Sequence, residues 1–235
     1  MPDIDAVLFD YGQTLVTFEY PKAELLEVIG NFRATIEETI GAPSPPAEDI
    51  LQQVFLPLEE YVSSPSEDEV DWLELAAASW ARAGLALPAG LLYEIVDAEQ
   101  ICWDRIVKVD ANATPVLTLL RGRGIRRAIC SNAPFPPEMM RRQVESNGIA
   151  ALMDGVVFSS MVGRRKPARE IYLAALDAVG VEPRRALFVG NRVREDYEGP
   201  LSLGMRAVLC TAHNHEPAPN GIETIASLSE LPEVL

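Results

Sequence analysis

The stretch Ala6-Val7-Leu8-Phe9-Asp10-Tyr11-Gly12-Gln13-Thr14 decides how the rest of the chain is interpreted. Four apolar residues end abruptly at an aspartate, and a glycine follows two positions later. A short apolar run bounded by a glycine-containing turn is typical of a buried strand and of the loop at its C-terminal end. We therefore expect a strand over 6–9, with Asp10 at the point where the chain leaves the sheet.

The second half of the chain alternates between short apolar runs and amphipathic stretches. The expected strands cover 125–131, 155–158, 186–189 and 207–210, and the expected helices cover 115–120, 137–147, 168–179 and 195–203. Strands that alternate with helices of this length form parallel sheets with helical crossovers. The sequence thus predicts the α/β class, with a doubly wound parallel sheet.

No strand signal interrupts residues 21–107, where apolar positions recur at helical spacing. Four helices are expected there, over 25–40, 50–61, 70–80 and 91–103. We therefore expect an all-helical domain, residues 18–107, inserted after the first strand. Residues 1–17 and 108–235 together would form the α/β core domain.

The composition limits the possible partners. The 235 residues include 35 acidic and 20 basic side chains, a formal charge of -15. Such a surface repels nucleic-acid backbones and anionic lipids, so we expect neither as a partner. The chain also lacks a basic leader segment and a long apolar run, so a cytoplasmic protein is expected. A small anionic substrate would need a locally basic site, and nothing in the sequence indicates the oligomeric state.

Polar residues that follow the predicted strands are the candidates for chemistry, because ligands bind beyond the carboxyl ends of such strands. Asp10 could act as a nucleophile through its carboxylate. Ser131 and Asn132 could hold an anionic group, and Lys166 could balance negative charge. Asp196, together with Asp10, could share a hard divalent cation such as Mg²⁺.

Four segments, in this order, resemble the motifs of the haloacid dehalogenase-like superfamily. They are Val7-Leu-Phe-Asp10-Tyr-Gly12-Gln-Thr14-Leu, Ile129-Cys-Ser131-Asn132-Ala, Gly163-Arg-Arg-Lys166-Pro167 and Val189-Gly190-Asn191-Arg-Val-Arg-Glu-Asp196. The helical block lies where the C1-type cap of that superfamily lies. The resemblance covers the whole chain and implies a hydrolase with a Rossmann-like core.

The resemblance also implies a role for each motif residue. Asp10 would be the nucleophile, Thr14 and Ser131 would position the transferred group, and Lys166 would be the balancing cation. Asn132 and Gly12 would contact substrate. The expected ligands of Mg²⁺ are Asp10, Asp196, Asn191 and the backbone carbonyl of Gly12.

Two positions depart from the pattern of the phosphatases in this superfamily. Gly12 stands where they carry a second aspartate, the general acid and base, whose help is worth roughly a hundred- to ten-thousand-fold. Asn191 stands where they carry a metal-binding aspartate, so weaker Mg²⁺ binding is expected. The superfamily's 2-haloacid dehalogenases also lack the second aspartate, use no metal and bring an arginine from the cap, for which Arg33 is a candidate.

Three hypotheses follow. The favoured one is a hydrolase of small phosphorylated compounds that works through an aspartyl-phosphate on Asp10 with Mg²⁺. The second is a metal-independent 2-haloacid dehalogenase. The third is a catalytically impaired protein that keeps the fold for binding or regulation. His213 and His215, an isolated His-x-His, are interpreted as part of a solvated loop.

Overall fold

The computed structural model describes residues 3–214 and 218–235, and it has the α/β architecture expected. One parallel sheet has the strand order β5-β4-β1-β6-β7-β8. These strands are β1 (Ala6–Phe9), β4 (Arg126–Ser131), β5 (Gly155–Phe158), β6 (Ala186–Gly190), β7 (Arg206–Cys210) and β8 (Thr224–Ile225). The chain runs from β1 through β4 to β5 and then returns to β6 on the other side of β1. The strand order therefore reverses at β1, which opens a crevice at its C-terminal end.

Both faces of this sheet are buried, which explains why the strands are apolar without alternation. In β1 the side chains of Val7 and Phe9 join one apolar cluster and those of Ala6 and Leu8 join the other. The first cluster is covered by α6 (Ala113–Gly122), α7 (Pro137–Ser146) and the 3-10 helix Leu228–Glu233. The second is covered by α9 (Arg169–Val179) and by the segment around α10 (Gly199–Ser202). The short α8 (Ser159–Val162) follows β5.

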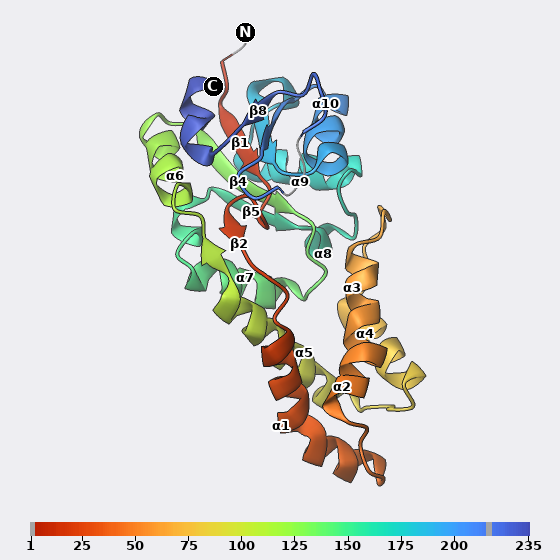
Figure 1. The fold of residues 1–235 in the computed structure, drawn as a ribbon. Coiled ribbons are helices and arrows are strands. Elements are labelled where there is room, and N and C mark those ends of the chain that lie inside the picture. Colours follow the sequence, from red (N-terminus) through yellow and green to blue (C-terminus); the bar gives the residue numbers. More distant parts are fainter. Residues whose placement is uncertain (1–2, 215–217) are drawn as a thin grey trace.

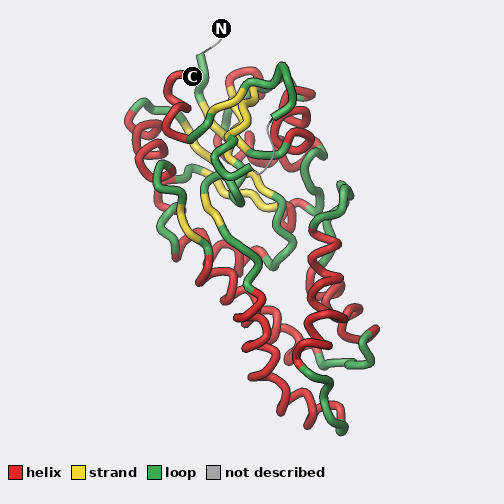
Figure 2. The backbone as a smooth tube through the Cα atoms, viewed as in Figure 1, coloured by secondary structure: helices red, strands yellow, loops and turns green. Residues whose placement is uncertain are grey.

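The helical block extends as a separate lobe beyond the C-terminal edge of the sheet (Figure 1). Its helices are α1 (Lys22–Ile40), α2 (Ala47–Ile50), α3 (Leu56–Val62), α4 (Trp72–Arg82) and α5 (Ala89–Ile106). A π-helical turn, Leu51–Phe55, joins α2 to α3, so the expected helix over 50–61 is one run with a local bulge. Figure 2 shows that this lobe contains helices and loops, and that the strands lie in the other part of the molecule.

A two-stranded antiparallel sheet joins the two parts and was not anticipated. β2 (Val16–Thr17) pairs with β3 (Lys108–Val109), with Val16 opposite Val109. The helical block therefore follows β2 instead of β1. Strands of two residues are too short to produce an alternating pattern, which is why the sequence did not reveal them.

The expected helix over 195–203 is also different. It begins as a π-helical turn, Val193–Glu198, and only then continues as α10. Such turns are rare and frequent at functional sites. Within the described residues, no helix is long and apolar enough to cross a membrane.

Candidate active site

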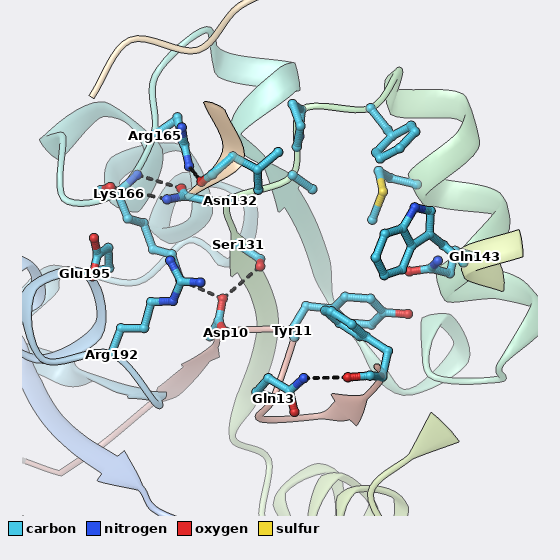
Figure 3. Close-up of a pocket in the computed structure, with 18 of the residues that line it drawn as sticks. Asp10, Tyr11, Gln13, Ser131, Asn132, Gln143, Arg165, Lys166, Arg192 and Glu195 are labelled. Atoms are coloured by element: carbon cyan, nitrogen blue, oxygen red, sulfur yellow. Dashed lines mark hydrogen bonds and ion pairs between the residues drawn. The ribbon is translucent and has the colours of Figure 1, made fainter. Parts of the chain in front are cut away.

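Asp10 lies directly after β1, and its side chain is held by two partners from other motifs. Its Oδ1 accepts a hydrogen bond of 2.7 Å from Ser131 Oγ and one of 2.7 Å from Lys166 Nζ (Figure 3). Ser131 is the last residue of β4, and all four residues of β1 pair with β4. Adjacent parallel strands thus bring together two residues that are 121 positions apart in the chain.

Lys166 joins two carboxylates in the interior. Its Nζ lies 2.7 Å from Asp10 Oδ1 and 2.6 Å from Asp196 Oδ1, and the three residues are 3%, 7% and 0% exposed. Burial opposes the charged form of a lysine, but the two carboxylates outweigh it and raise the pKa of Lys166 above its ordinary value. Burial also raises the pKa of Asp196, against the opposing effect of Lys166. The cluster therefore holds a permanent cation beside the candidate nucleophile.

Asp196 is fixed by the backbone on its other side. Its Oδ2 accepts hydrogen bonds of 2.9 Å from the amide N–H groups of Asn191 and Arg192. A Cβ atom on residue 190 would lie 2.4 Å from Asp196 Cγ. Glycine is thus required at position 190 because the carboxylate occupies the space of a side chain.

Asn132 supports the lysine through backbone contacts. Its Oδ1 accepts a 2.7 Å hydrogen bond from the Lys166 N–H, and its Nδ2 donates to the Lys166 carbonyl at 3.3 Å. Asn132 lines the same cavity as Asp10. Its amide therefore orients the loop that carries Lys166, while one edge of the side chain faces the site.

Asn191 offers an oxygen donor. Its Nδ2 donates to Asn214 Oδ1 at 3.2 Å, which directs Oδ1 the other way. That Oδ1 is buried without a partner in the described part of the chain, and Asn191 lines the cavity. An orphaned amide oxygen in the cavity that Asp10 also lines fits a hard cation. Asp196 would have to share Oδ1 with Lys166, and among residues 3–214 and 218–235 no group of three or more His, Cys, Asp or Glu could hold a metal.

The cavity above Asp10 has a volume of about 330 Å³ and is lined by both parts of the molecule. The core side chains include Asp10, Gln13, Ser131, Phe135, Gln143, Arg165, Lys166, Arg192 and Glu195, and the helical lobe adds Glu59, Val62, Ser63, Gln100 and Trp103. Figure 3 shows Lys166 and Arg192 on one side of this space and Gln143 on the other. The site is therefore a partly open pocket between the core and the lobe, with Lys166 and Arg192 at the Asp10 end.

Arg165 connects the two sides. Its guanidinium donates to the carbonyl groups of Tyr61 and Val62 at the end of α3 and lies 5.6 Å from the centre of the Tyr61 ring. Arg165 is only 3% exposed. In the sequence it is one of two adjacent arginines before Lys166 and gives no signal of this role.

These features agree with a family comparison. A family model described as haloacid dehalogenase-like hydrolase matches residues 4–204. The chain belongs to the haloacid dehalogenase-like hydrolases.

Several characterised haloacid dehalogenase-like relatives are similar to this chain. A glyceraldehyde 3-phosphate phosphatase from Methanothermobacter thermautotrophicus is 32% identical over 53% of this chain and 57% of the relative. The pyrimidine 5'-nucleotidase YjjG from Escherichia coli is 26% identical over 98% of this chain and 97% of the relative. A crystal structure of a 2-haloacid dehalogenase from Pseudomonas syringae superposes with a TM-score of 0.73 over 98% of this chain and 97% of that one, at 20% identity, and so shares the fold.

Of two further expected site residues, Gly12 lines the cavity and Thr14 does not. Thr14 is fully buried, its hydroxyl has no partner among the described residues, and it does not line the cavity. Gly12 lines the cavity, but a Cβ at this position would lie 3.1 Å from two ring atoms of Phe18. Gln13, in a left-handed conformation with φ of 58°, faces the cavity between them.

Outside the site, His213 Nε2 lies 2.9 Å from Asp110 Oδ2. His215 lies outside the described residues. Arg33 contacts Glu37 and the Ser44 carbonyl and does not line the cavity.

Proposed function

We propose that this protein is a phosphatase of small phosphate monoesters that forms an aspartyl-phosphate on Asp10. The observation that carries the proposal is the arrangement of Asp10 itself. Its Oδ1 is held by Ser131 and Lys166, while its Oδ2 has no hydrogen bond to any described residue and the side chain faces the cavity. We also propose that residues 18–107 form a C1-type cap domain over a core of residues 1–17 and 108–235.

The reaction has two steps. Asp10 Oδ2 attacks the phosphorus, and the bond from phosphorus to the alcohol oxygen breaks as the acyl phosphate forms. Water then attacks the same phosphorus, which frees inorganic phosphate and restores the carboxylate. Lys166 and the Ser131 hydroxyl stabilise negative charge in both steps, since they lie at hydrogen-bond distance from the reacting carboxylate.

Mg²⁺ would be held by Asp10, by the orphaned Oδ1 of Asn191 and by the backbone carbonyl of Gly12. Bound there, it supplies positive charge next to the phosphate oxygens. Asp196 supports this site by fixing Lys166 and the backbone at Asn191.

The departing alkoxide must gain a proton, and Gly12 offers none. The ring of Phe18 lies beside this position, so the space is not open to a second carboxylate without a shift of that ring. The proton comes from water or from a group in the cap. Substrates whose leaving group needs no proton are therefore turned over faster than alkyl phosphates.

The curated sequence relatives support the phosphatase chemistry, since both relatives named above are described as enzymes that act on phosphorylated substrates. The test is release of inorganic phosphate from acetyl phosphate, p-nitrophenyl phosphate, sugar phosphates and nucleoside monophosphates, with Mg²⁺ and with EDTA. The control is Asp10→Asn. Phosphate release no higher than that of the control, from every compound, rejects the proposal.

A 2-haloacid dehalogenase is the second candidate, and the missing side chain at Gly12 favours it. In this reaction Asp10 attacks carbon, halide leaves without a proton, and water cleaves the resulting ester. Arg33 lies away from the cavity, so Arg165 and Arg192 are the arginines near a bound carboxylate. Halide release from 2-chloropropionate in the presence of EDTA would support a dehalogenase, and its absence at high enzyme concentration rejects it.

Stabilisation of the fold by phosphate without any turnover would indicate a binding protein instead of an enzyme.

A further inference from the structure

The cap side of the cavity presents hydrogen-bond acceptors that have no donors. Gln100 on α5 is 1% exposed and lines the cavity, and its Oε1 has no partner among the described residues. Asp104 decides this orientation, because its Oδ1 accepts from Gln100 Nε2 at 2.9 Å and from Gln143 Nε2 at 3.0 Å. A carboxylate only accepts, so both amides must turn their NH₂ groups toward it. Gln100 is thereby left with its carbonyl oxygen directed away from Asp104.

Two carboxyl groups lie on the same side without a cation. Glu59 on α3 lines the cavity, and Glu99 on α5 is 3% exposed. Neither forms an ion pair or a side-chain hydrogen bond within the described part of the chain. Burial raises the pKa of Glu59 to about 7, and burial together with Glu59 raises the pKa of Glu99 well above its usual range. Without a cation among the described residues, burial favours the neutral form of both carboxyl groups, and a bound cation would favour ionisation of Glu59.

Aromatic rings line the same cavity as Glu59. Phe18 and Trp103 line the cavity with their ring centres 5.6 Å apart, and the ring of Tyr20 lies 5.9 Å from that of Trp103. The Tyr20 hydroxyl and the Trp103 N–H are buried and have no partner among the described residues. Carboxylates, an amide oxygen and aromatic faces together are the groups that bind an ammonium ion, and the free N–H can bind a neighbouring oxygen.

We propose that the substrate is a phosphate monoester whose alcohol carries a primary ammonium group, bound by Glu59 and Gln100 at the cap end of the cavity. This rests on the proposed phosphatase function. The phosphate lies at the Asp10 end, where Lys166, Arg192 and Ser131 offer hydrogen-bond donors. The ammonium group lies at the cap end, beside Glu59. A substrate with charges of both signs matches the two ends of this cavity.

The experiment compares substrates that differ only in the amine. Ethanolamine phosphate is paired with 2-hydroxyethyl phosphate, and glucosamine 6-phosphate with glucose 6-phosphate. The wild-type chain is expected to prefer the amine of at least one pair by about 10- to 100-fold in kcat/KM, which is what one charge-assisted hydrogen bond contributes. Glu59→Gln should reduce this preference to less than about threefold, and Glu99→Gln provides a second variant.

Glu60→Gln is the matched control, because Glu60 is the exposed neighbour of Glu59 on the same helix and should keep the full preference. Equal use of both members of each pair by the wild-type chain overturns the inference, as does a preference that persists in Glu59→Gln and Glu99→Gln. Acetyl phosphate has no alcohol, so its turnover tests the phosphatase function separately. If acetyl phosphate and the esters are all inert, thermal stabilisation by each pair decides the inference: greater stabilisation by the amines supports it, and equal stabilisation rejects it.

Discussion

Replacing Lys166 by methionine tests whether the buried cation holds the site together. Among the described residues, the change removes the only group that pairs with Asp196 Oδ1, and Asp196 is fully buried. Removing one partner of a buried ion pair costs about 3–5 kcal/mol. Two backbone N–H groups still bind Asp196 Oδ2, so we expect the lower end, about 3 kcal/mol. For a chain of this length that corresponds to a fall in Tm of roughly 6–12 °C.

The assay is urea unfolding followed by circular dichroism, with thermal unfolding as a second measurement. Asp196→Asn in the Lys166→Met background should recover part of the loss, because an amide oxygen can still accept both backbone hydrogen bonds. The loss should also be smaller at pH 5 than at pH 8. Burial already raises the pKa of Asp196, and without Lys166 its protonation relieves the buried charge as the pH falls.

The control is Arg184→Met, which removes an ion pair of 2.9 Å to Glu182 that is largely exposed. Exposed pairs contribute about 0–1 kcal/mol, so this variant should unfold close to the wild type. If Lys166→Met loses less than about 1 kcal/mol, or if the double variant is no more stable than the single one, the buried charge cluster does not have the energetic role assigned to it.

Three further predictions concern single residues. Glu59→Gln should stabilise the fold at pH 8 by up to about 3 kcal/mol and should not stabilise it at pH 4. Because the pKa of Glu59 is raised to about 7, its ionised form begins to cost stability above the ordinary pKa and reaches the full cost above pH 7. Equal urea midpoints of the variant and the wild type at pH 8 would contradict this. Asn191→Asp should lower the Mg²⁺ concentration for half-maximal turnover by about tenfold, since it restores a negative ligand, and an unchanged Mg²⁺ titration would argue against a metal at this amide. Gly190→Ala should cost about 3 kcal/mol because its Cβ would meet Asp196, whereas Gly30→Ala, with open space around it, should be neutral or slightly stabilising in the same denaturation assay.

The sequence by itself determined where five strands of the parallel sheet lie along the chain and which residues stand at their ends. Val7 to Asp10 and Ala186 to Asn191 are apolar runs that stop at polar residues, and this local pattern depends only on neighbours in the chain. It therefore predicted the parallel sheet and the meeting of Asp10 with Ser131 and Lys166. The helical periodicity of residues 21–107 likewise predicted the lobe from local spacing alone.

Only the tertiary structure decided what surrounds Asp10. The two-residue strands β2 and β3 form because distant segments pair, and neither has a pattern of its own. From the sequence, Arg165 is indistinguishable from a surface arginine, but in the structure it donates to a carbonyl group of α3. Likewise, Glu59 has the pattern of a solvated helix acid, but in the structure it lines the cavity between the lobe and the core. Whether a polar side chain faces water, a partner or a cavity depends on atoms far away in the sequence. Spacing along the chain located Asp10 as the candidate nucleophile, whereas packing between the core and the lobe decided which side chains line the cavity around it.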